Sequence, residues 1–78
     1  MNIAKKQVAE SLSGIICNNF RMVREGWDNR SLAISMTAWY QYNSALIDEY
    51  FRQGLITKGA VKRLKAYNEK LFYEGAAI

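Results

Sequence analysis

Apolar residues recur every three or four positions through most of this chain, and this spacing places them along one face of an α-helix. Advancing by about 100° per residue gathers one apolar arc in the first third of the chain. The residues on that arc are Ala4, Val8, Leu12, Ile15, Met22 and Val23, with Ile16 at its edge. The pattern predicts a first helix over residues 3–25.

Two further apolar arcs follow at the same helical spacing. The arc in the middle third contains Leu32, Met36, Trp39, Leu46, Ile47 and Tyr50, with Tyr40 and Phe51 widening one edge. The arc in the last third contains Ala60, Val61, Leu64, Tyr67, Leu71 and Phe72. These arcs predict helices over residues 30–53 and 58–74. Gly54 is expected to end the second helix and Thr57 to cap the third.

The connections between the predicted helices are short, and the 78 residues include five glycines and no proline. Alternation of apolar and polar residues, which would indicate a strand, nowhere extends beyond a few positions. We therefore expect an all-α protein with a single domain, residues 1–78. Short connections favour either a three-helix bundle or a helical hairpin crossed by the N-terminal helix.

Each predicted helix carries one asparagine near the middle of its apolar arc, and these are Asn19, Asn43 and Asn68. A side-chain amide left unpaired in a core costs roughly 1–3 kcal/mol, so each of the three needs a hydrogen-bond partner. In one interpretation the amides bond one another in a buried polar layer that fixes the helix register. In the other, at least one amide faces a subunit or partner interface.

The small size of the chain limits how it is stabilised. A domain of this length buries only about 60% of the surface that its unfolded chain exposes. Cys17 is the one cysteine and histidine is absent, so an internal disulfide is excluded and the commonest metal ligand is missing. Self-association is one way to supplement such a core. A lone thiol and the lack of a long apolar run lead us to expect a cytoplasmic protein without membrane contact.

The sequence offers little catalytic chemistry. Without histidine, neither a Cys–His nor a Ser–His–Asp system can form within one chain. Asp48 and Glu49 are consecutive on a predicted helix and diverge by about 100°, so they do not converge as paired catalytic carboxylates. The glycines form no phosphate-binding loop. We expect a protein that is not an enzyme and that uses neither a metal nor a cofactor.

Positive charge gathers on the third predicted helix of a chain whose net charge is +4. The basic residues that project away from its apolar arc are Lys58, Lys62, Arg63, Lys65 and Lys70. Glu69 is the one acid that opposes them on this helix face. One interpretation is a basic face that lies along phosphates or docks an acidic protein. The other is a solvated face whose lysine stems cover apolar neighbours.

The reversal at Gly54 does not match a DNA-binding helix-turn-helix. When Gly54 is aligned with the turn glycine of that motif, Glu49 and Tyr50 occupy positions that need an apolar and a small residue. The segment Gly54-Leu55-Ile56-Thr57 resembles the turn of the short C-terminal oligomerisation hairpin known as SHOCT, although the acidic residue usual after that turn is missing. Four residues identify no family, and the resemblance implies only that this turn reverses a helix.

Two aromatic residues are candidates for contact with a partner. Trp27 falls between the first two predicted helices, where it would either plug the end of the bundle or anchor an interface. Tyr42 falls on a helix flank with Ala38 and Ala45, whose small side chains would allow another helix to approach closely. Most of the other aromatic residues are interpreted as core.

These features lead to three hypotheses about function. The first is a small non-enzymatic protein that binds another protein, as an adaptor or inhibitor, through a basic and aromatic surface. Its size is typical of proteins that phages and mobile elements encode. The second is a nucleic-acid-binding module whose third helix follows the phosphate backbone. The third is a structural homo-oligomer. Retention on nucleic acid and mass in solution would distinguish the three.

Overall fold

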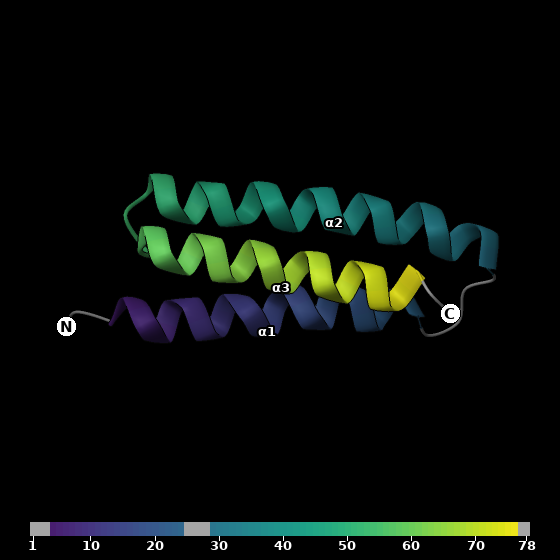
Figure 1. Cartoon of the computed structure of the whole chain (residues 1–78), viewed down its shortest axis with the longest axis horizontal. Coiled ribbons are helices and arrows are strands. Elements are labelled where there is room, and N and C mark those ends of the chain that lie inside the picture. The colour runs from purple at the N-terminus through teal and green to yellow at the C-terminus, as the bar shows by residue number, and fades with distance from the viewer. Residues whose placement is uncertain (1–3, 25–28, 77–78) are drawn as a thin grey trace.

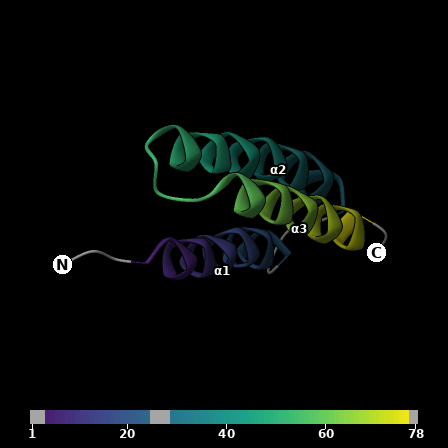
Figure 2. The same cartoon turned by 60° about the vertical axis from the view of Figure 1, so that its left-hand side comes forward.

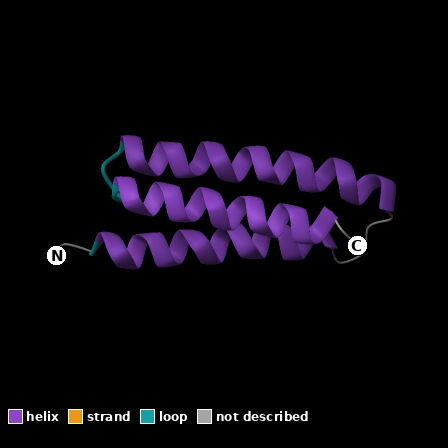
Figure 3. Cartoon of the chain, in the orientation of Figure 1, coloured by secondary structure: helices purple, strands orange, loops and turns teal. Residues whose placement is uncertain are grey.

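The computed structural model describes residues 4–24 and 29–76, and these residues form three α-helices (Figure 1). The helices are α1 (Lys5–Arg24), α2 (Asn29–Arg52) and α3 (Lys58–Ala76). The expected all-α fold is thus confirmed, and every helix end falls within two residues of its predicted position. Within the described residues, loop structure is confined to Ala4 and the connection between α2 and α3 (Figure 3).

The helices run up, down and up along one long axis, so α1 and α3 point the same way and α2 runs against both (Figure 1). Each helix packs against the other two, which makes the molecule a three-helix bundle and excludes a hairpin merely crossed by α1 (Figure 2). Its extents are 44 × 20 × 16 Å. None of the described helices combines the length and the apolar character that crossing a membrane requires.

The turn between α2 and α3 is built by local signals that the sequence displays. Gly54 has a φ of +75°, a left-handed conformation that costs glycine little. Its N–H donates to the carbonyl of Phe51 at 2.9 Å, and the N–H of Leu55 donates to that of Tyr50 at 2.9 Å. This pair of bonds is the Schellman ending of a helix. Thr57 Oγ1 then accepts from the N–H of Ala60 at 3.1 Å, which confirms Thr57 as the cap of α3.

The core takes residues from all three helices and from the turn. Its buried apolar members are Leu12, Ile16, Phe20, Val23, Met36, Ile47, Ile56, Ala60 and Leu64. Ile56, which lies in the turn, is 1% exposed and belongs to the same core cluster. Partly buried aromatic and aliphatic side chains pack around this core, among them Trp39, Tyr40 and Tyr50.

The prediction of which α1 residues face inward was partly wrong. Ile15 and Met22, placed inside, are 40% and 53% exposed, whereas Ile16, placed at the edge, is fully buried. Phe20, which the predicted arc omitted, is 3% exposed. The reason is that α1 faces two neighbours at once, so its buried arc is centred between α2 and α3 and rotates toward Ile16 and Phe20. Phe51, at the predicted edge of the α2 arc, is likewise 44% exposed.

Candidate functional site

The three asparagines meet in the middle of the bundle. Asn19 Nδ2 donates to Asn43 Oδ1 at 2.9 Å, and Asn43 Nδ2 donates to Asn68 Oδ1 at 3.1 Å. Asn68 Nδ2 completes the chain by donating to the backbone carbonyl of Tyr40 at 3.0 Å. Asn43 and Asn68 are 0% and 1% exposed, and no buried side-chain polar atom in the described part of the molecule lacks a partner. The geometry is that of an internal polar layer.

This layer takes one amide from each helix, so it ties the three helices to one register. Sliding any helix by a turn would separate its amide from the other two and leave buried donors and acceptors unpaired, at about 1–3 kcal/mol for each. Asn43 is the central member because it accepts from Asn19 and donates to Asn68. Its amide faces inward and is not available to a partner.

The basic residues of α3 do not form one free face. Lys65 Nζ lies 2.8 Å from Asp48 Oδ1 of α2, and Lys70 Nζ lies 4.0 Å from Glu74 Oε1. On the sequence of this helix alone, only Glu69 opposed these cations, because Asp48 belongs to α2 and approaches Lys65 only in the folded bundle. Arg63 lines a groove that α3 shares with α1, and Lys58 and Lys62 are exposed. The five predicted basic residues are therefore of three kinds: two are paired with acids, one lines a groove, and two are exposed without an ion pair in the described residues.

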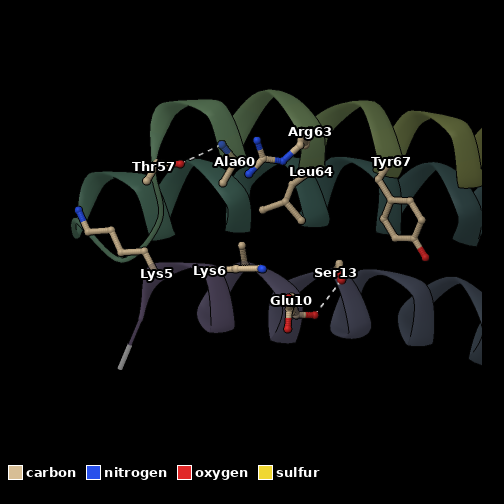
Figure 4. A pocket seen from close by; sticks show the side chains of 10 residues that line it. Lys5, Lys6, Glu10, Ser13, Thr57, Ala60, Arg63, Leu64 and Tyr67 are labelled. Carbon is tan, nitrogen blue, oxygen red and sulfur yellow. Dashed lines mark hydrogen bonds between the residues drawn. The ribbon is translucent and has the colours of Figure 1, made fainter. Parts of the chain in front are cut away.

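Arg63 instead belongs to a groove between the first halves of α1 and α3, with a volume of about 490 Å³ (Figure 4). The residues that line it are Lys5, Lys6, Ala9, Glu10, Ser13, Thr57, Ala60, Arg63, Leu64 and Tyr67. The Arg63 guanidinium lies back over the first turn of α3, where its Nη1 is 3.5 Å from the position that a Cβ on Gly59 would take. The groove thus places cations from two helices around one hollow.

Lys5, Lys6, Lys58, Lys62 and Arg63 together form what we name the basic end. Among the residues that the structure describes, none of these five cations has an ion-pair partner. The end is also where α1 and α3 both begin, and neither helix has an acidic residue in its first turn (Figure 1). Helix N-termini carry partial positive charge and normally attract acids. The positive charges of the side chains and the positive ends of the two helix dipoles therefore both raise the electrostatic potential at this end.

The acids of α2 at the same end do little to offset this charge. Glu49 Oε2 accepts from Arg52 Nε at 2.8 Å, Glu49 Oε1 accepts from Gln53 Nε2 at 2.8 Å, and Arg52 Nη2 also contacts Oε1. These hydrogen bonds, first from Arg52 and then from Gln53, lower the pKa of Glu49 from its ordinary 4.5 to about 2. Glu49 is thus engaged within α2, and Asp48 is engaged by Lys65.

Tyr67 lines the groove at the end away from Thr57. Its ring reaches from α3 toward α1 (Figure 4). A hydrogen bond between its hydroxyl and the Cys17 side chain, followed by partial burial, raises the pKa of Tyr67. Cys17 itself is exposed.

The structure does not bring Tyr42 to the basic end. Tyr42 is 54% exposed and makes an edge-to-face contact with Trp39, with ring centroids 5.2 Å apart. Tyr40 contacts Phe72 of α3, and two further residues turn a helix by about 200°, so Tyr42 points away from α3. Trp27, the other predicted aromatic contact, lies outside the described residues.

Sequence reasoning missed Lys5 and Lys6 as members of the site. The signal was present, because two adjacent lysines at the start of a helix without nearby acids are electrostatically unfavourable there. Their place in the same groove as Arg63, however, depends on α1 and α3 running parallel and starting at the same end of the bundle. That alignment is a property of the bundle and not of either helix alone.

The described residues contain no group of three or more acids and cysteines placed to hold a metal ion. Comparison with known proteins gives no further guide, since no family model, curated protein or solved structure matches the chain.

Proposed function

We propose that this protein is a non-enzymatic helical interaction protein, an adaptor or an inhibitor, that binds an acidic region of another protein through the basic end. The observation that carries the proposal is the gathering of five cations without ion-pair partners, within the described residues, where two helix N-termini meet. The exposed thiol of Cys17 suits a reducing compartment, so the proposal places this binding in the cytoplasm.

The placement of these charges opposes the stability of the free protein. A cation in the first turn of a helix interacts unfavourably with the helix dipole, by about 0.3–1 kcal/mol when exposed. Lys5, Lys6 and Lys58 all occupy such positions. Carboxylates of a partner would relieve the repulsion among the cations and satisfy the free N–H groups of both helix starts. This placement of cations is explained by binding of an acidic surface, and it is not explained by a contribution to folding.

The test uses poly-glutamate as a carboxylate probe, with binding followed by fluorescence anisotropy at low and high salt. We expect the double variant K62E/R63E to lose about tenfold or more in affinity. The matched control is the double reversal R21E/K70E, at two exposed cations outside the basic end, which makes the same change in net charge and should keep most of the affinity. Absence of binding at about 50 mM salt, or equal losses in the variant and the control, would overturn the proposal.

Nucleic-acid binding is the second candidate, because the same end offers helix N–H groups and cations that suit phosphate. Tracking of a phosphate backbone along α3 is less favoured, since Lys65 and Lys70 already face Asp48 and Glu74. If a DNA or RNA duplex is retained more strongly than poly-glutamate, this candidate replaces the first. The salt dependence of log affinity would then have a slope near −0.9 per phosphate neutralised.

A structural homo-oligomer is the third candidate, and a specific surface favours it. The α2 sequence carries no charged residue from Ser31 to Ile47, and its Ile34 and Tyr42 are 69% and 54% exposed. This stretch is the place where a second copy with the same net charge of +4 would meet least repulsion. Sedimentation at micromolar concentration decides the matter, since a monomeric mass would exclude an obligate oligomer.

A further inference from the structure

We propose that the groove between α1 and α3 receives a short amphipathic helix of the partner, with acidic residues toward its C-terminal end, laid antiparallel to α1 and α3. This inference rests on the proposed function, and it names the form of the acidic region that binds. Three properties of the groove carry it: an apolar floor, a cationic rim at one end, and an opposite end that the Tyr67 ring crosses (Figure 4).

The floor of the groove is apolar and unfilled. Leu64 and Ala60 are nearly buried, and Ala9 is partly buried, yet all three line the hollow. The alanines of α1 and α3 leave space where longer side chains would have met. A volume of about 490 Å³ falls within the range of about 300–1,000 Å³ typical of ligand-binding pockets. The space therefore accepts apolar side chains that point down from an occupant.

The rim is positive at the end where α1 and α3 begin. Lys5, Lys6 and Arg63 line this end, and Thr57 keeps a hydroxyl proton to donate because its oxygen accepts from Ala60. Glu10 is the one acid of the lining, and it lies farther along α1. The carboxylates of an occupant therefore belong at the start of α1 and α3, with its uncharged part beside Glu10.

The end that the Tyr67 ring crosses sets the length of the occupant. Tyr67, whose ring reaches from α3 toward α1 (Figure 4), lines the groove ten residues after Thr57. Ten residues of helix rise by about 15 Å, which corresponds to between two and three helical turns. A short helix of that length matches the groove and would offer apolar residues at three- and four-residue spacing.

The bundle itself contains a precedent for this mode of packing. On another side of α3, α2 runs antiparallel and carries acids in its last two turns, and its Asp48 pairs with Lys65. An occupant of the α1–α3 groove with the same direction would bring its negative helix end and its acids to Arg63, Lys5 and Lys6. Charge complementarity thus determines the orientation as well as the identity of the segment.

The probe is a fluorescein-labelled amphipathic peptide that has leucines at helical spacing and glutamates in its C-terminal half. A second peptide of the same composition carries the glutamates in its N-terminal half. Anisotropy titrations at equal salt should show tighter binding of the first peptide, by about fivefold or more. Equal affinity for the two peptides would overturn the antiparallel orientation.

Two protein variants test the groove. R63E reverses a charge that lines the groove, while K62E makes the same change at the neighbouring residue, which does not line it. We expect a loss of about tenfold or more for R63E and about threefold or less for K62E. S13W places a bulky ring in the groove and should abolish binding, with circular dichroism and a urea melt showing that the bundle stays folded.

The outcomes separate this inference from the proposed function. If R63E and K62E weaken binding equally and folded S13W binds normally, acidic segments bind the basic end by charge alone. In that case the groove proposal fails and the proposed function stands. If neither the peptides nor poly-glutamate bind the wild-type protein, both fail. If S13W does not fold, the comparison of R63E with K62E decides the question on its own.

Discussion

The middle of the bundle and its basic end differ in whether their polar side chains have partners within the molecule. In the middle, the amides of Asn19, Asn43 and Asn68 are joined in one hydrogen-bonded chain, and each contributes to holding the fold. At the basic end, Lys5, Lys6, Lys58, Lys62 and Arg63 find no ion-pair partner within the described residues. The amides of the middle are satisfied within the molecule, whereas the five cations of the basic end are left to solvent or, as we propose, to an acidic partner.

The largest effect should come from breaking the polar layer at its centre. Asn43→Ala removes a donor and an acceptor, leaves Asn19 Nδ2 and Asn68 Oδ1 without their partner, and opens a cavity. We expect a loss of about 2–4 kcal/mol in the free energy of unfolding, measured by urea denaturation. Asn18→Ala, at an exposed position beside the layer, should cost less than about 0.5 kcal/mol. A loss below about 1 kcal/mol for Asn43→Ala would show that the layer does not hold the fold.

Replacing all three layer asparagines by leucine should raise the free energy of unfolding, whereas Asn43→Ala lowers it. An apolar layer needs no internal partners, so we expect a gain of about 1–2 kcal/mol in the free energy of unfolding. The register would lose its polar constraint, and broadened amide resonances would report several helix alignments. A variant that is both less stable than the wild type and sharp in its spectrum would contradict the register role.

The basic end should respond to charge in a way that the layer does not. Lys58→Glu places an acid in the first turn of α3, where the helix dipole favours it. We expect a gain of about 0.3–1 kcal/mol in the free energy of unfolding together with weaker binding of poly-glutamate. The same substitution at Lys70 should lower stability, because it loses the contact with Glu74 and lies toward the negative end of the helix. A stability loss for Lys58→Glu would remove the argument that these lysines oppose folding.

The smallest effect concerns pH. The pKa of Glu49 is about 2 in the folded protein and 4.5 ordinarily, so its contribution to stability is fully present above 4.5 and is lost as the pH falls toward 2. A carboxyl titration by NMR should give this low value, and Arg52→Gln should raise it, since Arg52 is its main hydrogen-bond donor. The amide layer contains no titrating group and should keep its resonances through the same range. An ordinary pKa for Glu49 would show that the hydrogen bonds from Arg52 do not persist in solution.

Local signals explain why much of the fold was predictable. Gly54 and Thr57 mark the turn through backbone geometry and capping, which depend on neighbouring residues only. The asparagines were recognisable because each sits among apolar residues at helical spacing. Their mutual bonding, however, requires that the three helices place them at one height, and residue spacing within a single helix does not contain that information.

The site was less predictable because it depends on which helices lie side by side. The basic face expected on α3 is divided in the structure, since Asp48 arrives from α2 to pair with Lys65. Lys5 and Lys6 line the same groove as Arg63 only because α1 and α3 run parallel. The rotation of α1 that exposes Ile15 has the same origin, because the buried arc of a helix is set by all of its neighbours.

The most direct test is a titration of isotopically labelled protein with the C-terminally acidic amphipathic peptide, followed by NMR of the backbone and asparagine side-chain amides. The account predicts that backbone signals of residues 5–13 and 57–67 shift together. The side-chain amides of Asn43 and Asn68, buried in the layer, should stay unchanged. Shifts concentrated on α2 between residues 34 and 46, or movement of the layer amides without shifts at the basic end, would contradict it.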